Sequence, residues 1–209
     1  MTTLALLGGT GRTGRLLIDQ ALVQGHRLRV LARTPEKVHR KEDDLLTVVP
    51  GDARDREAVA RLVGGADVVL SALGPVRGGP PDVMTLAARH LTQVLPEQGI
   101  RRLITLTGAG VPFDGDRPKA VDYVFRTALR LLQPDVLRDS AAHATLIRES
   151  DLDWTVVRVP RLTDGPEKPL RVGMVGQIGT QITRASVSRF MLDQVEGREH
   201  VRQAPAISN

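Results

Sequence analysis

Three glycines with the spacing of a phosphate-binding loop stand near the start of the chain. Residues 8–14 read Gly-Gly-Thr-Gly-Arg-Thr-Gly, so Gly9, Gly11 and Gly14 fit the pattern G-x-G-x-x-G. The early glycines of such a loop permit a tight turn, the middle one lets the backbone approach a pyrophosphate, and the last allows close helix–strand packing. The start of the following helix attracts the phosphates. We therefore predict a dinucleotide site here, with contacts from Gly8, Thr10, Gly11, Arg12, Thr13 and Gly14.

Arg33 occupies the position at which such a site distinguishes its ribose. An acidic residue about 20 positions beyond the loop binds the free 2′-hydroxyl of NAD, whereas an arginine there accommodates the 2′-phosphate of NADP. Arg12 adds a second guanidinium, a group that binds phosphate in a planar, bidentate manner. The pattern favours NADP(H), with Arg33 and Thr34 as further contacts. The alternative is that Arg33 is only a solvated charge at the end of a strand.

Alternating strand-like and helix-like segments must position these residues. This alternation predicts parallel βαβ units and a doubly wound sheet in one domain, residues 1–209. Residues 165–179, rich in Gly and Pro, are expected to form a loop with a short strand near 170–172, and residues 160–185 a substrate-side cap. The expected strands are 3–7, 28–32, 45–49, 66–72, 102–106 and 154–159, and the expected helices are 12–24, 55–63, 82–95, 139–149 and 186–195.

The loop and several later segments resemble the atypical short-chain dehydrogenase/reductase family, above all its biliverdin IXβ reductase/flavin reductase-like subgroup. The similar segments are 51–52, 71–74, 149–158, 161–165 and 182–185. The resemblance covers about residues 3 to 207 and implies a Rossmann sheet with a small C-terminal substrate cap. The chain departs from the family at Val159, Ser140 and Ser186, on the substrate side or its support. Further cofactor contacts implied by the resemblance are Asp52, Ala53, Ala72, Leu73, Gly74, Thr107 and Pro160.

The proton-transfer pair Tyr-x-x-x-Lys of ordinary short-chain dehydrogenases is missing. Tyr123 is the only tyrosine, and Thr127 stands where the lysine would be. Oxidation of alcohols or reduction of isolated ketones needs a poised acid or base. Hydride transfer to an acceptor that stabilises charge itself, such as a flavin, quinone or bilin, mainly needs orientation. We therefore expect an NADPH-dependent oxidoreductase that acts on a conjugated small molecule.

Two residues are candidates for contact with the reacting groups. Thr107 resembles the family's Ser/Thr near the nicotinamide, where its hydroxyl could bind the carboxamide or the acceptor; alternatively it bonds its own turn. His143 lies on a predicted helix near the substrate side and could donate a proton; alternatively it is structural or solvated. Thr107 and His143 are therefore the two predicted catalytic residues.

Composition excludes several other classes of protein. The chain has 209 residues and no cysteine, so disulfides are impossible. It contains neither a signal-peptide pattern nor an apolar run of about 18 residues, so we expect a cytoplasmic protein without a membrane span. The net charge of +5 is scattered among acids and accompanied by few aromatic residues, so nucleic acid is not an expected partner. No metal site is expected, because no histidines or acids have metal spacing.

The sequence is compatible with two functions besides an NADPH-dependent reductase. One is a non-enzymatic NADP(H) sensor, and the other is a tailoring enzyme, a reductase or oxygenase, of aromatic natural-product biosynthesis. All three functions permit an intact glycine loop. A small-molecule acceptor and a monomer or homodimer are expected for the favoured one.

Overall fold

One eight-stranded sheet forms the centre of residues 1–75 and 78–209, which the computed structural model describes. Its strands are β1 (Thr3–Leu7), β2 (Arg27–Ala32), β3 (Leu46–Pro50), β4 (Val68–Ser71), β5 (Arg102–Gly108), β6 (Asp153–Val159), β8 (Arg171–Gly173) and β10 (Ala206–Ser208). Their order is β3-β2-β1-β4-β5-β6-β10-β8. The first seven pair in parallel, and β8 pairs antiparallel with β10. The predicted Rossmann-type, doubly wound sheet is confirmed.

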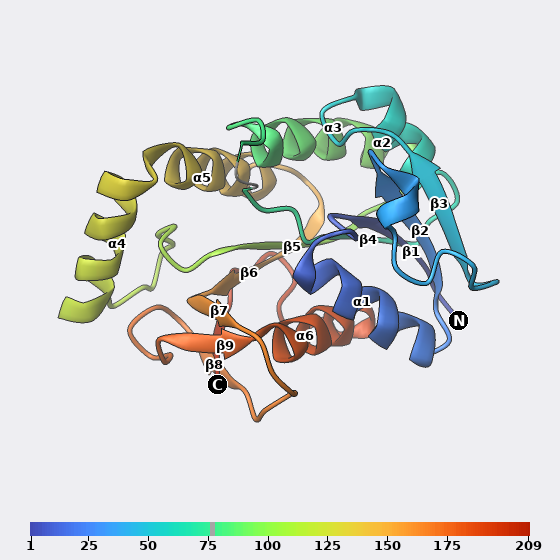
Figure 1. Cartoon of the computed structure of the whole chain (residues 1–209). Helices are drawn as coiled ribbons and strands as arrows, with labels where there is room; N and C mark the ends of the chain where they lie inside the picture. The colour runs from blue at the N-terminus through green and yellow to red at the C-terminus, as the bar shows by residue number, and fades with distance from the viewer. Residues whose placement is uncertain (76–77) are drawn as a thin grey trace.

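Helices cover both faces of this sheet (Figure 1). The helices on one face are α1 (Arg12–Val23) and α6 (Arg184–Glu196), and those on the other are α2 (Arg56–Val63), α3 (Val83–Glu97) and α5 (Pro134–Arg148). Each face buries its own apolar cluster, because alternate side chains of the strands point to opposite sides. Because these strands run parallel, their carboxyl ends lie along one edge of the sheet, where ligands of such sheets bind.

The first strand and helix form where the residue pattern predicts them. Leu4 and Leu6 are fully buried against one layer of helices, and Ala5 and Leu7 against the other. The apolar residues of α1 recur at helical spacing, and the chain leaves that helix through Gly25, whose φ of +75° suits a residue without a side chain. This unit fixes the glycine loop at the carboxyl end of β1.

A helix that the sequence analysis did not predict follows β5. It is α4 (Ala120–Leu132), at the left edge of Figure 1, and α5 begins at Pro134 rather than at the predicted residue 139. Proline fits the first turn of a helix because its missing N–H would be unbonded there. The two helices are separated only by Gln133, so the residue pattern shows no loop between them. The apolar residues Val121, Val124, Ala128 and Leu132 of α4 recur at helical spacing, so the sequence does carry a helical stripe here, and several of these side chains are exposed in the fold.

The C-terminal part of the chain adds short strands around the end of the sheet. The strand expected near residues 170–172 is confirmed as β8, which pairs with β10. A separate pair is formed by β7 (Arg161–Thr163) and β9 (Gln181–Thr183). These strands place residues 160–185 beside the carboxyl ends of β5 and β6. The three-residue strands β7 and β9 were not predicted, because so short a segment carries too little alternation.

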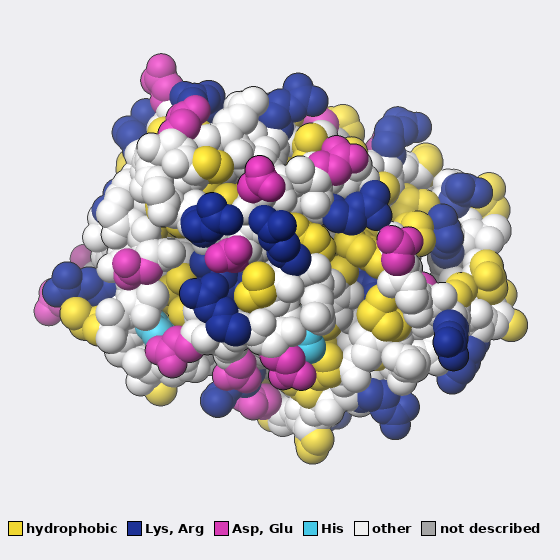
Figure 2. All heavy atoms as spheres, turned by 180° about the vertical axis from the view of Figure 1, so that it is seen from behind, with side chains coloured by type: hydrophobic (Ala, Val, Ile, Leu, Met, Phe, Trp, Pro, Cys, Tyr) yellow, Lys and Arg dark blue, Asp and Glu magenta, His cyan; other side chains and the backbone are white. Residues whose placement is uncertain are grey.

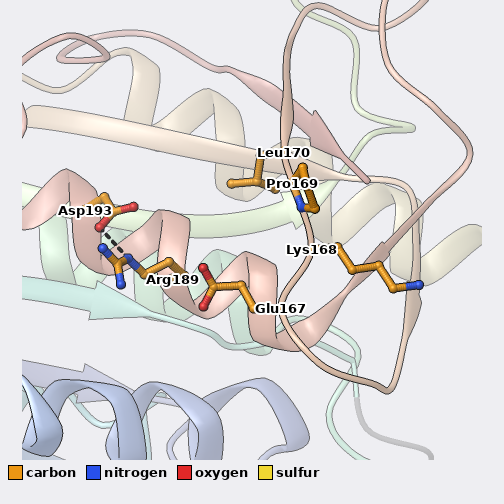
Figure 3. A pocket seen from close by; sticks show the side chains of 6 residues that line it. All are labelled: Glu167, Lys168, Pro169, Leu170, Arg189 and Asp193. Atoms are coloured by element: carbon orange, nitrogen blue, oxygen red, sulfur yellow. Dashed lines mark hydrogen bonds and ion pairs between the residues drawn. The ribbon is translucent and has the colours of Figure 1, made fainter.

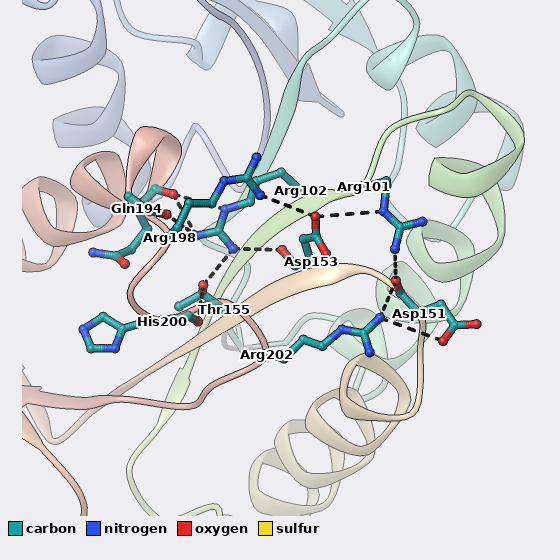
Figure 4. Close-up of polar contacts among 10 residues, drawn as sticks. Arg101, Arg102, Asp151, Asp153, Thr155, Gln194, Arg198, His200 and Arg202 are labelled. Carbon is teal, nitrogen blue, oxygen red and sulfur yellow. Dashed lines mark hydrogen bonds and ion pairs between the residues drawn. The ribbon is translucent and has the colours of Figure 1, made fainter.

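Arg102 ties the opposite end of the sheet to α6 (Figure 4). Its guanidinium donates to the carbonyl oxygens of Gln194 and Asp153 and to the hydroxyl of Thr155, at 2.7–2.8 Å. Burial, reinforced by the charge of Arg198, lowers the pKa of Arg102 to about 10. This arginine therefore anchors the last turn of α6, where cations are favoured by the helix dipole.

The surface mixes both signs of charge. The rear face in Figure 2 shows Lys and Arg side chains interspersed with Asp and Glu, with hydrophobic side chains between them. None of the helices formed by the described residues is long and apolar enough to cross a bilayer.

Candidate functional site

A cavity of about 600 Å³ lies at the carboxyl ends of β1, β2 and β4. Its size is typical of sites for small molecules and cofactors. Most of the predicted cofactor contacts line it together: Gly8, Thr10, Gly11, Arg12, Thr13, Arg33, Thr34, Asp52, Ala53, Ala72, Leu73 and Gly74. The predicted contacts Gly14, Thr107 and Pro160 are not among its lining residues.

The glycines of the loop have different structural duties. Gly8 has a φ of +80°, and a Cβ there would lie 2.7 Å from the carbonyl carbon of Ala72. A Cβ on Gly14 would collide with the Gly8 carbonyl oxygen, so the loop can keep this conformation only without a side chain at position 14. A Cβ on Gly11 would meet only that same oxygen, at 3.2 Å, so this position remains open toward the cavity. Gly11 is therefore the glycine whose missing side chain matters most for a ligand.

The start of α1 is suited to an anion. Gly11 is its N-cap, and no side chain among the described residues caps the first turn. The helix dipole adds partial positive charge at this point. Arg12, Arg33, Lys37 and Arg184 bring further positive charge to the cavity lining. This chemistry fits the phosphates of a nicotinamide dinucleotide.

Basic residues gather at the end of β2, where an adenosine 2′-phosphate would lie. Arg33 and Thr34 line the cavity there together with Lys37, which ends the short 3-10 helix η1 (Pro35–Lys37). Lys37 was missed by the sequence analysis, because its place depends on the tight turn after Thr34. Burial raises the pKa of the nearby Asp52, but hydrogen bonds from Arg54 and the charge of Arg33 outweigh it and hold that pKa below its usual value. Asp52 therefore stays ionised at this corner of the cavity.

Arg12 lines the same cavity and contacts a residue from the C-terminal part of the chain. Its Nη1 is 3.3 Å from Oδ2 of Asp164, a residue just beyond β7. Arg184, a lining residue that the sequence analysis did not single out, donates to Oδ1 of the same carboxylate at 2.7 Å. Arg12 and Arg184 thus share one carboxylate.

Thr107 lies at the end of β5 with its side chain buried. The residue is 3% exposed, and its buried hydroxyl has no hydrogen-bond partner among the described residues. The neighbouring Leu106 lines the cavity, as does Leu162 from β7. An unpaired buried hydroxyl is costly, but Thr107 does not line the cavity, so its contact with a ligand stays a prediction.

His143 lies away from the cavity lining, beneath β5. It is buried, and its Nε2 is 2.9 Å from the hydroxyl of Thr105. Burial lowers the pKa of His143 to about 4, against a weaker opposing effect from Asp139. Asp139 itself accepts from the amides of Met84 and Thr85, at 3.0 and 2.8 Å, and joins α5 to the start of α3. The geometry around His143 is that of helix packing.

This burial predicts a pH dependence of stability. The folded pKa of about 4 lies below the ordinary 6.5, so folding favours the neutral ring. The associated stability is present above pH 6.5 and is lost as pH falls toward 4, by roughly 3 kcal/mol in total. His143→Gln should remove this part of the decline, as measured by urea unfolding at several pH values. Identical declines in wild type and variant would contradict the prediction, and exposed His39→Gln is the control.

A buried ion pair holds the loop after β5 to β6 and to the segment after β8. Arg158 on β6 is fully buried and forms two bonds to Asp116, of 2.7 and 2.9 Å. Asp116 also accepts from the amides of Phe113 and Val175, at 2.9 and 3.1 Å. The guanidinium lies 4.8 Å from the centre of the Phe113 ring. The loop after β5 and the segment after β8 therefore both depend on one carboxylate, whose role no local motif reveals.

A second cavity, of about 480 Å³, lies between residues 167–170 and α6 (Figure 3). Its charged side chains have both signs, and Arg189 pairs with Asp193 at 2.8 Å. It lacks the glycine backbone and the set of cations found at the first cavity, so it is the weaker candidate.

Comparisons with known proteins agree with this geometry. A model of an NAD(P)H-binding protein family matches residues 8–198. The oxidoreductase stcQ of Emericella nidulans is 25% identical over 231 residues, covering 99% of this chain and 83% of the relative. A short-chain dehydrogenase/reductase of Veillonella parvula, solved in complex with NADP, has a TM-score of 0.82 at 19% identity and covers 100% and 94% of the two chains. ChuY, an anaerobillin reductase of Escherichia coli O157:H7, has a TM-score of 0.83 at 19% identity and covers 99% and 97%.

Proposed function

The chain belongs to the NAD(P)H-binding family and is an NAD(P)H-dependent oxidoreductase, and we propose that it transfers hydride from NADPH to a conjugated small molecule. The expected resemblance to atypical short-chain dehydrogenases/reductases is confirmed by the family match and the solved relatives. The observation that carries the proposal is the cavity, in which an open glycine backbone and basic residues at β2 meet. NADPH bound there would supply the hydride.

The lining of the cavity supports a conjugated acceptor. Among the described lining residues, the only acid is Asp52, at the adenosine end, and there is no tyrosine or histidine. Tyr123 lies on α4 with 56% of its surface exposed. A carbonyl that must be protonated during reduction would lack a poised acid. A flavin, quinone or bilin spreads the added charge over its own ring system, so the chain needs mainly to orient it and exclude water.

We expect the coenzyme preference to depend on Arg33 and Lys37. A charged hydrogen bond contributes roughly 1.5–3 kcal/mol, so Arg33→Ala should weaken NADPH about 10- to 150-fold and leave NADH nearly unchanged. Arg33→Asp should go further, because its carboxylate repels the phosphate and can accept from a ribose hydroxyl. Calorimetric dissociation constants for both coenzymes test this, with Arg27→Ala as an exposed control at the start of β2. Equal affinity of the wild type for NADPH and NADH would refute the NADP assignment.

Tyr123→Phe should change turnover by less than about tenfold, since a true general acid or base contributes 10²–10⁴-fold. The reason is its position on α4, outside the cavity lining. Steady-state rates of NADPH oxidation with menadione as acceptor provide the measurement. A thousandfold loss would show that this tyrosine does transfer a proton.

A further inference from the structure

Two arginines from distant parts of the chain converge on one carboxylate at the cavity. Arg12 follows Gly11 in the glycine loop, and Arg184 is the first residue of α6. Both line the cavity, and both bond to Asp164, through different oxygens of its carboxylate. The two helices are themselves in contact, because the hydroxyl of Ser188 donates to the carbonyl of Thr13 at 3.2 Å. The arginines thus form a pair whose shared partner is an anion.

Burial differs sharply between the members of this cluster. The side chain of Arg184 is 8% exposed, whereas that of Asp164 is 71% exposed. A guanidinium so deeply buried needs a counter-ion, because an unpaired buried charge is costly. Among the described side chains, Asp164 is the one acceptor that Arg184 reaches. Asp164 can leave at little cost, since water would solvate its exposed carboxylate.

We propose that Arg12 and Arg184 form the site for the dinucleotide pyrophosphate, and that Asp164 holds this site until the cofactor displaces it. This inference rests on the proposed function. Arg12 is one peptide unit from Gly11, where the backbone is open to a pyrophosphate. A diphosphate offers more oxygens than a carboxylate and accepts bidentate bonds from guanidinium groups. Asp164 is thus an internal competitor that keeps Arg184 paired before binding.

Two substitutions test this with opposite expected signs. Arg184→Gln should weaken NADPH and NADH by the same factor, about tenfold or more, because both coenzymes carry the pyrophosphate. Asp164→Asn removes the competitor and should tighten both coenzymes, by about two- to fivefold. The matched controls are Arg189→Gln and Asp193→Asn, an exposed pair on the same helix. Calorimetric titration measures all constants, and thermal unfolding checks that each variant is folded.

Three results would overturn the inference. The first is an unchanged dissociation constant in folded Arg184→Gln. The second is weaker cofactor binding in Asp164→Asn, which would mean that Asp164 contacts the bound cofactor. Asp164 is exposed, so this variant should fold even if Arg184→Gln does not. The third is an unchanged dissociation constant for the cofactor in Arg184→Gln together with a raised KM for the acceptor. It would assign the two arginines to an anionic group of the acceptor. Failure of the wild type to bind NADPH at all would instead refute the proposed function.

Discussion

Gly11→Val should weaken NADPH binding by more than about a hundredfold while the protein stays folded. The valine would fill the space through which the backbone approaches the pyrophosphate, and losing two charged hydrogen bonds there costs roughly 3 kcal/mol or more. The fold should adjust locally, because the φ of −75° suits any residue and only the backbone oxygen of Gly8, 3.2 Å from the added Cβ, has to shift by a few tenths of an ångström. Calorimetric titration with NADPH, together with circular dichroism, gives both results.

The control for this substitution is Gly64→Val, since a Cβ at Gly64 meets nothing closer than 3.7 Å and the residue is outside the cavity lining. This variant should bind NADPH as the wild type does. A folded Gly11→Val that binds NADPH with wild-type affinity would show that the pyrophosphate lies elsewhere. Gly14→Val is unsuitable, because its side chain would break the loop itself.

Asp116→Asn should destabilise the fold by roughly 3–5 kcal/mol, because it leaves the buried guanidinium of Arg158 without its counter-ion. For a chain of this length, that corresponds to a fall in Tm of about 6–20 °C. Differential scanning calorimetry measures it. The same change at Asp193, in an exposed pair, should cost under about 0.5 kcal/mol.

The double variant Asp116→Asn/Arg158→Met separates the ion pair from general disruption. Replacing the guanidinium by an apolar side chain removes the unpaired charge, so part of the lost stability should return. Stability of Asp116→Asn equal to that of the wild type would contradict the assigned role. So would a double variant whose loss equals the sum of the two single losses.

Much of the fold follows from patterns local in sequence. The alternation of apolar strands and amphipathic helices predicts the first six strands of the chain and the glycine turn, because each unit buries a face set by its own period. By contrast, α4 was not predicted although Val121, Val124 and Leu132 recur at helical spacing; these side chains are exposed in the fold, so their burial does not mark the helix. The short strands β7, β9 and β10 exist through pairing with distant partners, which local residues do not specify.

The candidate site shows the same division. The glycine loop and Arg33 are recognisable because their spacing along the chain is itself the signal. Arg184 is 172 positions beyond Arg12 and Asp164 lies between them, so only the folded chain brings the three together. The pair of Arg158 and Asp116 is equally remote from any motif, and Asp116 stands beside Gly115 in what looks like an ordinary turn.

The rate of NADPH oxidation with FMN, menadione and a bilin, compared with a simple aliphatic ketone, tests the proposed hydride transfer most directly. We expect turnover with at least one conjugated acceptor, none with the ketone, and a slower rate when the transferred hydrogen at C4 of NADPH is replaced by deuterium. Tight NADPH binding in calorimetry without oxidation above the rate in buffer, for every acceptor, would contradict a reductase and favour a sensor of NADP(H).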